Sequence, residues 1–139
     1  RYYPDRAYAD SKQANLLFTL ELQRRLDAVG SGVRAVSAHP GIASTNLGAH
    51  LGGLRGMVAE IAVRFVAQDA EHGALPTLYA ATQDIPGNTY VGPAGLGHMR
   101  GAPMVMAPSK ASQDPALALR LWARSATLTG VHMPLLAAA

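Results

Sequence analysis

Apolar residues recur at helical spacing in the first part of the chain. From about Asp5 to Val29 leucines and alanines return every three or four positions, which predicts a helix with a wide apolar face. Gly30-Ser31-Gly32 is a typical helix-ending signal. The segment of residues 33–38 is short and largely apolar, and its position before Pro40 predicts a buried strand. A long helix followed directly by a buried strand indicates an αβ unit of a parallel sheet covered on both faces.

The rest of the chain predicts two more helices and one more strand. Asp69 is suited to cap a helix over residues 70–82. Asp114-Pro115 is suited to begin a helix that runs to about Ser125, with Leu117, Leu121 and Trp122 facing inward. A turn over residues 85–88 leads into a short strand over 89–91. Residues 94–112 are rich in Gly, Pro and Met without a clear period, and we expect a loop there.

Composition narrows the function classes. A length of 139 residues suits one domain, and the 15% of charged residues is low, which fits a fragment whose elements pack on missing parts, or an oligomer. The net charge of +3 is scattered, so we expect no nucleic-acid partner. The absence of cysteine excludes disulfides and thiol catalysis, and no metal-ligand spacing occurs among the histidines. No segment is long and apolar enough to predict a membrane span, and we expect a cytoplasmic, bacterial protein.

The candidate chemistry lies at two places. Tyr8 and Lys12 are four residues apart, so on a helix they share a face. An ammonium beside a phenol favours the phenolate, and such a tyrosine can exchange a proton with an alcohol or a carbonyl oxygen. Pro40-Gly41 follows the predicted strand, and a hydroxyl follows at Thr45. Ligands of parallel sheets bind beyond the carboxyl ends of the strands, which is where this Pro-Gly turn is expected.

These motifs carry a family resemblance. The pattern YxxSK at Tyr8–Lys12, followed by PGxxxT at Pro40–Thr45, resembles the C-terminal half of the short-chain dehydrogenase/reductases. The finer match is to the branch of retinol dehydrogenases and WW-domain oxidoreductases. It extends over YADSKQANLLFTLELQRRL, VRAVSAHPGIASTNL, DAEHGALPTLYAAT and RLWARSATLTG. The resemblance implies an α/β fold, namely the C-terminal half of one doubly wound, Rossmann-type domain that spans residues 1–139.

The resemblance also implies a function. The protein would be an NAD- or NADP-dependent oxidoreductase that transfers a hydride between nicotinamide and an alcohol or carbonyl substrate. Tyr8 would act as general acid/base and Lys12 would assist it and bind the nicotinamide ribose. The remaining cofactor contacts would come from the turn and the residues after it: Pro40, Gly41, Ile42 and Thr45. Residues 43–65 would close over the substrate.

Parts of the family pattern are missing from this sequence. It has no Gly-rich dinucleotide loop after a strand and no catalytic serine before the tyrosine, so we expect the N-terminal half of the domain to lie outside it. Two alternatives stay open: an inactive Rossmann-type binding or interaction module, and a fragment completed by a separate N-terminal chain. The resemblance further implies a homo-oligomer, either a dimer or a tetramer.

Four other residue sets need a role. His39 is interpreted as a structural histidine at the end of the strand. Asn15 follows Tyr8 by two helical turns, and a helix asparagine with satisfied hydrogen bonds is favoured over a cleft residue. Trp122 is interpreted as a core anchor. For the loop residues His98, Met99 and Met104, a substrate pocket and plain loop or dimer packing are both open.

Overall fold

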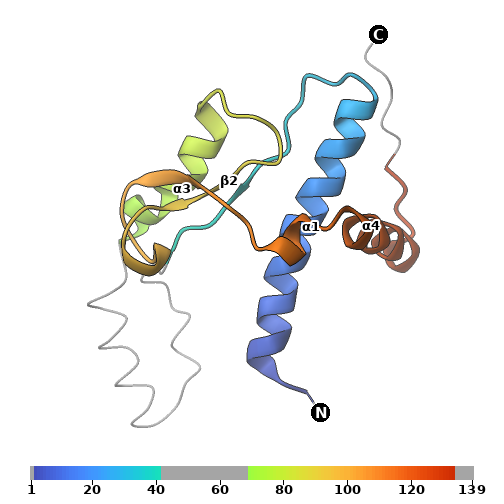
Figure 1. Cartoon of the computed structure of the whole chain (residues 1–139), viewed down its shortest axis with the longest axis horizontal. Helices are drawn as coiled ribbons and strands as arrows, with labels where there is room; N and C mark the ends of the chain where they lie inside the picture. Colours follow the sequence, from blue (N-terminus) through green and yellow to red (C-terminus); the bar gives the residue numbers. More distant parts are fainter. Residues whose placement is uncertain (1, 42–68, 134–139) are drawn as a thin grey trace. The chain divides into compact units, whose positions relative to one another are not determined.

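The computed structural model of the chain describes residues 2–41 and 69–133 (Figure 1). In chain order the longer elements are α1 (Pro4–Ala28), β1 (Ser37–Ala38), α3 (Ala70–Thr82), β2 (Tyr90–Pro93), β3 (Pro103–Met106) and α4 (Pro115–Thr129). Two short 3-10 helices, η2 (Leu96–His98) and η3 (Lys110–Gln113), lie before β3 and α4. The described residues form two compact units, the first with residues 2–37, 86–89 and 107–133 and the second with 38–41, 69–85 and 90–106.

Local sequence signals fix both ends of α1. Pro4 stands in the first turn, where its missing N–H leaves no hydrogen bond unmade. At the other end Gly30 adopts a φ of +65°, which the absence of a side chain permits. Gly30 N–H then donates to Asp27 O at 3.1 Å and Ser31 N–H to Leu26 O at 3.0 Å. This pair of bonds is a Schellman motif, and the predicted helix is confirmed to within one residue at each end.

In the first unit α4 packs on α1 (Figure 1). Leu17 and Leu26 of α1 and Ala118 of α4 are buried. The ring of Phe18 stacks on Trp122 with 4.9 Å between the ring centroids. The guanidinium of Arg25 lies 4.6 Å from the centroid of the Trp122 ring, at cation–π distance. Trp122 thus joins the two helices, as its interpretation as an anchor requires.

A carboxylate is buried within α1. Only 1% of the Glu21 side chain is exposed. Arg24 donates from Nε and a terminal nitrogen to the two carboxylate oxygens at 2.8 and 2.7 Å, and Arg25 Nε donates at 2.7 Å. The hydrogen bond from Arg24 holds the pKa of Glu21 below its ordinary value despite the opposing effect of burial, and Arg25 lowers it further. The buried charge is therefore paired, as its desolvation demands.

The three strands form one mixed sheet in the order β1-β2-β3. Ser37 N–H donates to Thr89 O at 2.9 Å and His39 N–H donates to Val91 O at 3.0 Å, so both partners advance together and β1 runs parallel to β2. β3 is antiparallel to β2, with Tyr90 opposite Met106 and Pro93 opposite Pro103. In the second unit α3 packs on β2 and β3. The α/β class is confirmed, with a parallel pair extended by an antiparallel strand.

The predicted strand over residues 33–38 is wrong in its first four positions. Only Ser37 and Ala38 form β1. The N–H of Ala35 is bound by the side chain of Gln23, at 2.7 Å to Oε1, and Val33 is 63% exposed. The Ala35 carbonyl accepts from Asn88 N–H at 2.7 Å, but its N–H is held by a helix side chain and cannot join the strand ladder, so the regular strand begins only at Ser37.

The predicted loop over residues 94–112 is also wrong. It contains η2, β3 and most of η3. The hairpin closes through Ala94 N–H to Ala102 O and Gly95 N–H to Arg100 O, each at 2.8 Å. Gly101 takes a φ of +119°, a backbone conformation for which glycine is suited. The glycines in this segment led to the prediction of a loop, and two of them, Gly97 and Gly101, adopt positive φ angles in the connection between β2 and β3.

Helices α3 and α4 follow their predicted caps. Asp69 accepts from His72 N–H at 2.8 Å, and α3 covers the predicted residues 70–82. Asp114 accepts from the N–H groups of Ala116 and Leu117 at 2.9 and 3.1 Å. α4 continues four residues beyond the predicted end, to Thr129, and stops at Gly130 with a φ of +69°.

Candidate active site

Tyr8 and Lys12 lie on one exposed face near the start of α1. Tyr8 is 60% exposed, and Lys12 is exposed as well. The Nζ atom of Lys12 lies 5.3 Å from the centroid of the Tyr8 ring. Ser11, which lies between them in the motif, donates from Oγ to the carbonyl oxygen of Tyr8 at 2.7 Å. The phenol and the ammonium are thus neighbours on the helix surface, and the Ser11 hydroxyl is directed at the helix backbone.

The face of α1 that carries the pair can be followed along the helix. A residue advances about 100° around the axis, so Tyr8, Lys12, Asn15 and Thr19 fall within about 60° of one another. Further along this face Ser37 Oγ, at the start of β1, donates to Thr19 Oγ1 at 2.8 Å. The pair therefore shares the side of α1 that carries the hydrogen bond between Thr19 and Ser37.

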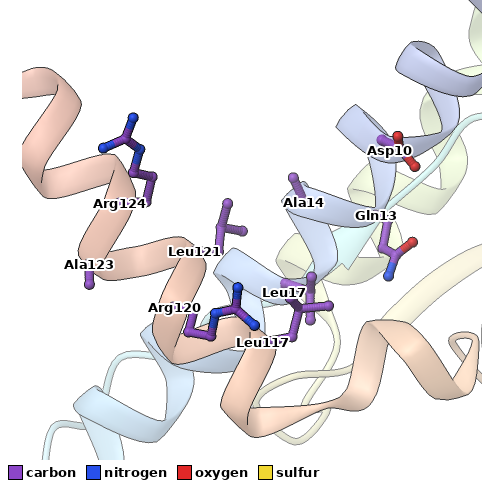
Figure 2. A pocket seen from close by; sticks show the side chains of 9 residues that line it. All are labelled: Asp10, Gln13, Ala14, Leu17, Leu117, Arg120, Leu121, Ala123 and Arg124. Atoms are coloured by element: carbon purple, nitrogen blue, oxygen red, sulfur yellow. The ribbon is translucent and has the colours of Figure 1, made fainter. Parts of the chain in front are cut away.

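A groove lies on the opposite face of α1. It has a volume of about 630 Å³ and runs between α1 and α4 (Figure 2). Neither Tyr8 nor Lys12 is among its lining residues, which are Asp10, Gln13, Ala14, Leu17, Leu117, Arg120, Leu121, Ala123 and Arg124. The α1 residues of the groove are turned by nearly half a rotation from Tyr8. The groove is therefore separate from the predicted catalytic pair.

The Pro40-Gly41 turn belongs to the second unit. Gly41 has a φ of +71°, in the left-handed region. A Cβ at this position would collide with the carbonyl oxygen of Met99 and come within 2.8 Å of Pro93 Cγ. Only glycine fits here on both counts, the backbone angle and the space.

His39 contacts the turn through its ring. Gly41 N–H donates to His39 Nδ1 at 3.1 Å. Nε2 lies 3.2 Å from the sulfur of Met106, and the ring stacks on Tyr90 with 5.3 Å between the centroids. Burial, with a smaller contribution from nearby His98, lowers the pKa of His39 from its ordinary value. The structural role predicted for His39 is thus matched by specific contacts on both ring nitrogens.

The loop between β2 and β3 lies on this turn. His98 Nδ1 is 3.2 Å from the carbonyl oxygen of Pro93, and Met99 approaches Gly41 by its backbone. Met104 is an exposed residue of β3. Of the three loop residues considered for a pocket, Met99 therefore packs against the Pro-Gly turn, His98 contacts Pro93, and Met104 is exposed.

Some predicted site residues lie outside the described part of the chain. These are Ile42, Thr45 and the segment 43–65 that was expected to close over the substrate. Asn15 is exposed, and its carbonyl oxygen accepts from Thr19 Oγ1 at 3.0 Å.

The sequence interpretation missed Gln23. This side chain is buried, accepts from Ala35 N–H through Oε1 and donates from Nε2 to Asp27 at 2.7 Å. Gly87 lies so close that a Cβ there would collide with the Gln23 amide. A polar residue on the apolar side of a predicted helix was the available signal, since a buried amide must find partners.

Residues 2–41 and 69–133 contain neither a cluster of metal ligands nor a membrane-spanning helix. No group of three or more His, Cys, Asp or Glu side chains is placed to hold a metal ion in this part of the chain. No helix within the same ranges is long and apolar enough to cross a membrane.

Comparison with known proteins gives relatives of named function. No family model matches the chain. Retinol dehydrogenase 13 from Homo sapiens is 35% identical over 143 residues, and polyprenol dehydrogenase from Mus musculus is 39% identical over 133 residues. These alignments cover 96% and 93% of this chain but 39% and 37% of the relatives. A short chain dehydrogenase/reductase from Macrophomina phaseolina is 36% identical over 115 residues, which are 83% of this chain and 55% of that protein.

A solved structure supports the same fold. The crystal structure of an uncharacterised protein from Mycobacterium paratuberculosis matches with a TM-score of 0.72 and 43% identity. It covers 97% of this chain, which in turn covers 42% of that protein. The chain therefore spans less than half the length of most of these proteins. The similarity extends along almost the whole chain and includes the YxxSK and PGxxxT motifs. It shows that the chain belongs to the short-chain dehydrogenase/reductase family and corresponds to a C-terminal part of such a protein.

Proposed function

We propose that the protein containing this chain is an NAD(P)-dependent oxidoreductase that interconverts an alcohol and a carbonyl compound. The observation that carries the proposal is the position of Lys12 Nζ, 5.3 Å from the Tyr8 ring on an exposed face of α1. The dehydrogenases and reductases among the relatives support it. The retained Tyr/Lys pair favours an enzyme over an inactive binding module.

In the proposed mechanism Tyr8 handles the proton. Its hydroxyl gives a proton to the substrate oxygen during reduction and takes it back during oxidation. The phenolate formed in the first direction carries a negative charge, which the ammonium of Lys12 stabilises from the same helix face. Both side chains are exposed in the part of the chain that the structure describes.

The chemistry of these side chains fits a nicotinamide cofactor. Lys12 has three N–H donors, which suit the vicinal hydroxyls of the nicotinamide ribose. Tyr8 is close enough to Lys12 to contact the same hydroxyls. Pro40, Gly41, Ile42 and Thr45 would provide the contacts to the carboxamide. When bound, the nicotinamide supplies or accepts the hydride, and the protein orients it.

The proposal requires the rest of the domain. We propose that residues 1–139 complete a single Rossmann-type domain whose N-terminal half holds the adenine side of the cofactor. That half would supply a serine for the substrate oxygen and decide between NAD and NADP. A homo-oligomer in the cytoplasm is part of the same proposal. Residues 1–139 on their own should bind NAD(P)H weakly and turn over no substrate.

The test uses the full-length protein. It is titrated with NADH and NADPH by fluorescence and assayed with a panel of aldehydes, ketones and alcohols. Tyr8→Phe should reduce turnover by roughly 100-fold or more, the size of a lost general acid, while cofactor binding persists. Tyr2→Phe is the matched control, because Tyr2 is 78% exposed and has Arg6 rather than a lysine four residues on. Full turnover by Tyr8→Phe would contradict the proposal.

A further inference from the structure

The hydrogen bond between Gly41 and His39 fixes which ring nitrogen carries the proton. A backbone N–H can only donate, so Nδ1 of His39 must present a lone pair to Gly41. The neutral ring then carries its proton on Nε2. That N–H is directed to the thioether of Met106 at 3.2 Å, which is a weak acceptor. The two contacts together specify one tautomer of a neutral imidazole.

The surroundings hold the ring in this orientation. Its face is stacked on Tyr90. Gly92 approaches so closely that a Cβ there would collide with both His39 Nε2 and the sulfur of Met106. A turned ring, with its nitrogens exchanged for carbons, would break both polar contacts without gaining space. The position of Nδ1 toward Gly41 is therefore set by three strand residues.

Protonation would remove the contact to the turn. A second proton can bind only at Nδ1, which then donates and no longer accepts from Gly41 N–H. Gly41 has little freedom to find another partner, because it is already in the left-handed region and in contact with Met99. The titratable groups that face the ring in the described residues are His98, from the loop after β2, and Tyr90, whose pKa is raised by burial. Among the described residues, a positive charge on His39 would therefore face a neutral phenol and another histidine, and no carboxylate.

We propose that neutral His39, with its proton on Nε2, is a positioning residue that holds the Pro40-Gly41 turn in the shape required for cofactor binding. Acid releases the turn by protonating Nδ1. The cofactor part of this inference rests on the proposed function, whereas the coupling of His39 to Gly41 concerns this chain alone. It extends the sequence interpretation of His39 as a structural histidine at the end of the strand.

Two substitutions distinguish the loss of the hydrogen-bond acceptor for Gly41 from the loss of the imidazole ring. His39→Asn places an amide oxygen where Nδ1 stands, so it can accept from Gly41 N–H two residues on, and it does not titrate. His39→Gln places its amide near the position of Nε2 and leaves Gly41 without an acceptor. Both lose the imidazole, so a role limited to packing would affect them alike. His72→Asn, at an exposed histidine of α3 paired with Asp69, is the control for general effects of acid.

The first measurement is made on the full-length protein with nitrogen-labelled histidine, by NMR between pH 7.5 and 5. We expect His39 to show an unprotonated Nδ1 and a protonated Nε2 at the upper end. As His39 titrates, the amide signal of Gly41 should move with the same midpoint. A proton on Nδ1 at neutral pH, or a Gly41 amide that ignores the titration, would overturn the proposal.

The second measurement is the dissociation constant of NADH and NADPH over the same range. The wild type and His72→Asn should bind about fivefold to tenfold more weakly at pH 5 than at pH 7.5, the scale of one lost hydrogen bond. His39→Asn should bind well with little pH dependence, and His39→Gln should bind weakly throughout. Equal behaviour of the Asn and Gln variants overturns the positioning role. If the wild type binds neither cofactor at any pH, the proposed function fails and the cofactor part of this inference fails with it, whereas the NMR result on Gly41 still stands.

Discussion

The two parts of the candidate site are built in opposite ways. Tyr8 and Lys12 are exposed on a helix surface and contact each other, with Lys12 Nζ 5.3 Å from the centroid of the Tyr8 ring. The Pro40-Gly41 turn is enclosed by Met99, Pro93 and the ring of His39. Removing a side chain from the helix pair should therefore change chemistry and leave stability intact, while a change in the turn should affect folding first.

The largest expected effect is on the exposed pair. Lys12→Met keeps a long side chain but removes the ammonium beside Tyr8. We expect turnover of the full-length protein to fall by roughly 100-fold or more, with weaker cofactor binding and an unchanged melting temperature. Lys110→Met, at the other lysine of the chain, is the control and should behave like the wild type. A matching loss of stability in Lys12→Met would break the contrast between the two parts.

In the enclosed turn, Gly41→Ala should act mainly on stability. The new Cβ meets the carbonyl of Met99, and alanine at a φ of +71° is strained. We expect a loss of about 2 kcal/mol or more in the free energy of unfolding, measured by urea titration. Gly32→Ala is the matched control, because nothing lies within 4 Å of its added Cβ. Equal stabilities of the two variants would show that the turn is less enclosed than described.

Glu21 extends the comparison to the part of α1 that is packed. Glu21→Gln should lower the free energy of unfolding by about 1–2 kcal/mol at pH 7, since bonds from both arginines lose the charge that strengthens them. The folded pKa of Glu21 is lowered, so this contribution is complete above the ordinary value of 4.5 and is lost as the pH falls through the folded value. The wild type should therefore approach the variant in stability in acid unfolding below about pH 4. A difference that persists there would contradict the pairing, and Glu71→Gln on the surface of α3 is the control.

The smallest expected effect concerns Gln23. Gln23→Leu removes the acceptor for Ala35 N–H and should lower the free energy of unfolding by about 1 kcal/mol. Amide hydrogen exchange should then be faster at Ala35, while the amides of α3 keep their protection. Unchanged exchange at Ala35 would mean that the Gln23 contact does not hold the segment before β1.

The parts of the fold that the sequence predicted are those set by neighbouring residues. Asp69 and Asp114 cap their helices through N–H groups two or three positions away, so their sequence context was sufficient. The start of β1 and the strand β3 depend on distant partners, namely Gln23 for Ala35 and β2 for β3. No window around Ala35 contains the information that a side chain twelve residues earlier binds its backbone.

The candidate site divides in the same way. The spacing of Tyr8 and Lys12 needs only helical geometry, and the structure places them on one face as that spacing predicts. The contacts of His39 with Tyr90 and Met106 come from strands more than 50 residues away, so the sequence could suggest a structural histidine but not its tautomer.

The face that Tyr8 and Lys12 share with Thr19 has a consequence for changes in chain length. Thr19 is tied to the start of β1 by Ser37, so the phase of the helix at that point is fixed. Deleting one residue between Lys12 and Thr19 would rotate the pair by about 100°, and deleting two would turn it toward α4. An insertion of seven residues completes nearly two turns and would restore the direction, although it moves the pair by about 10 Å along the axis. Over this stretch of α1, natural or designed variants should therefore tolerate substitutions far better than single-residue insertions or deletions.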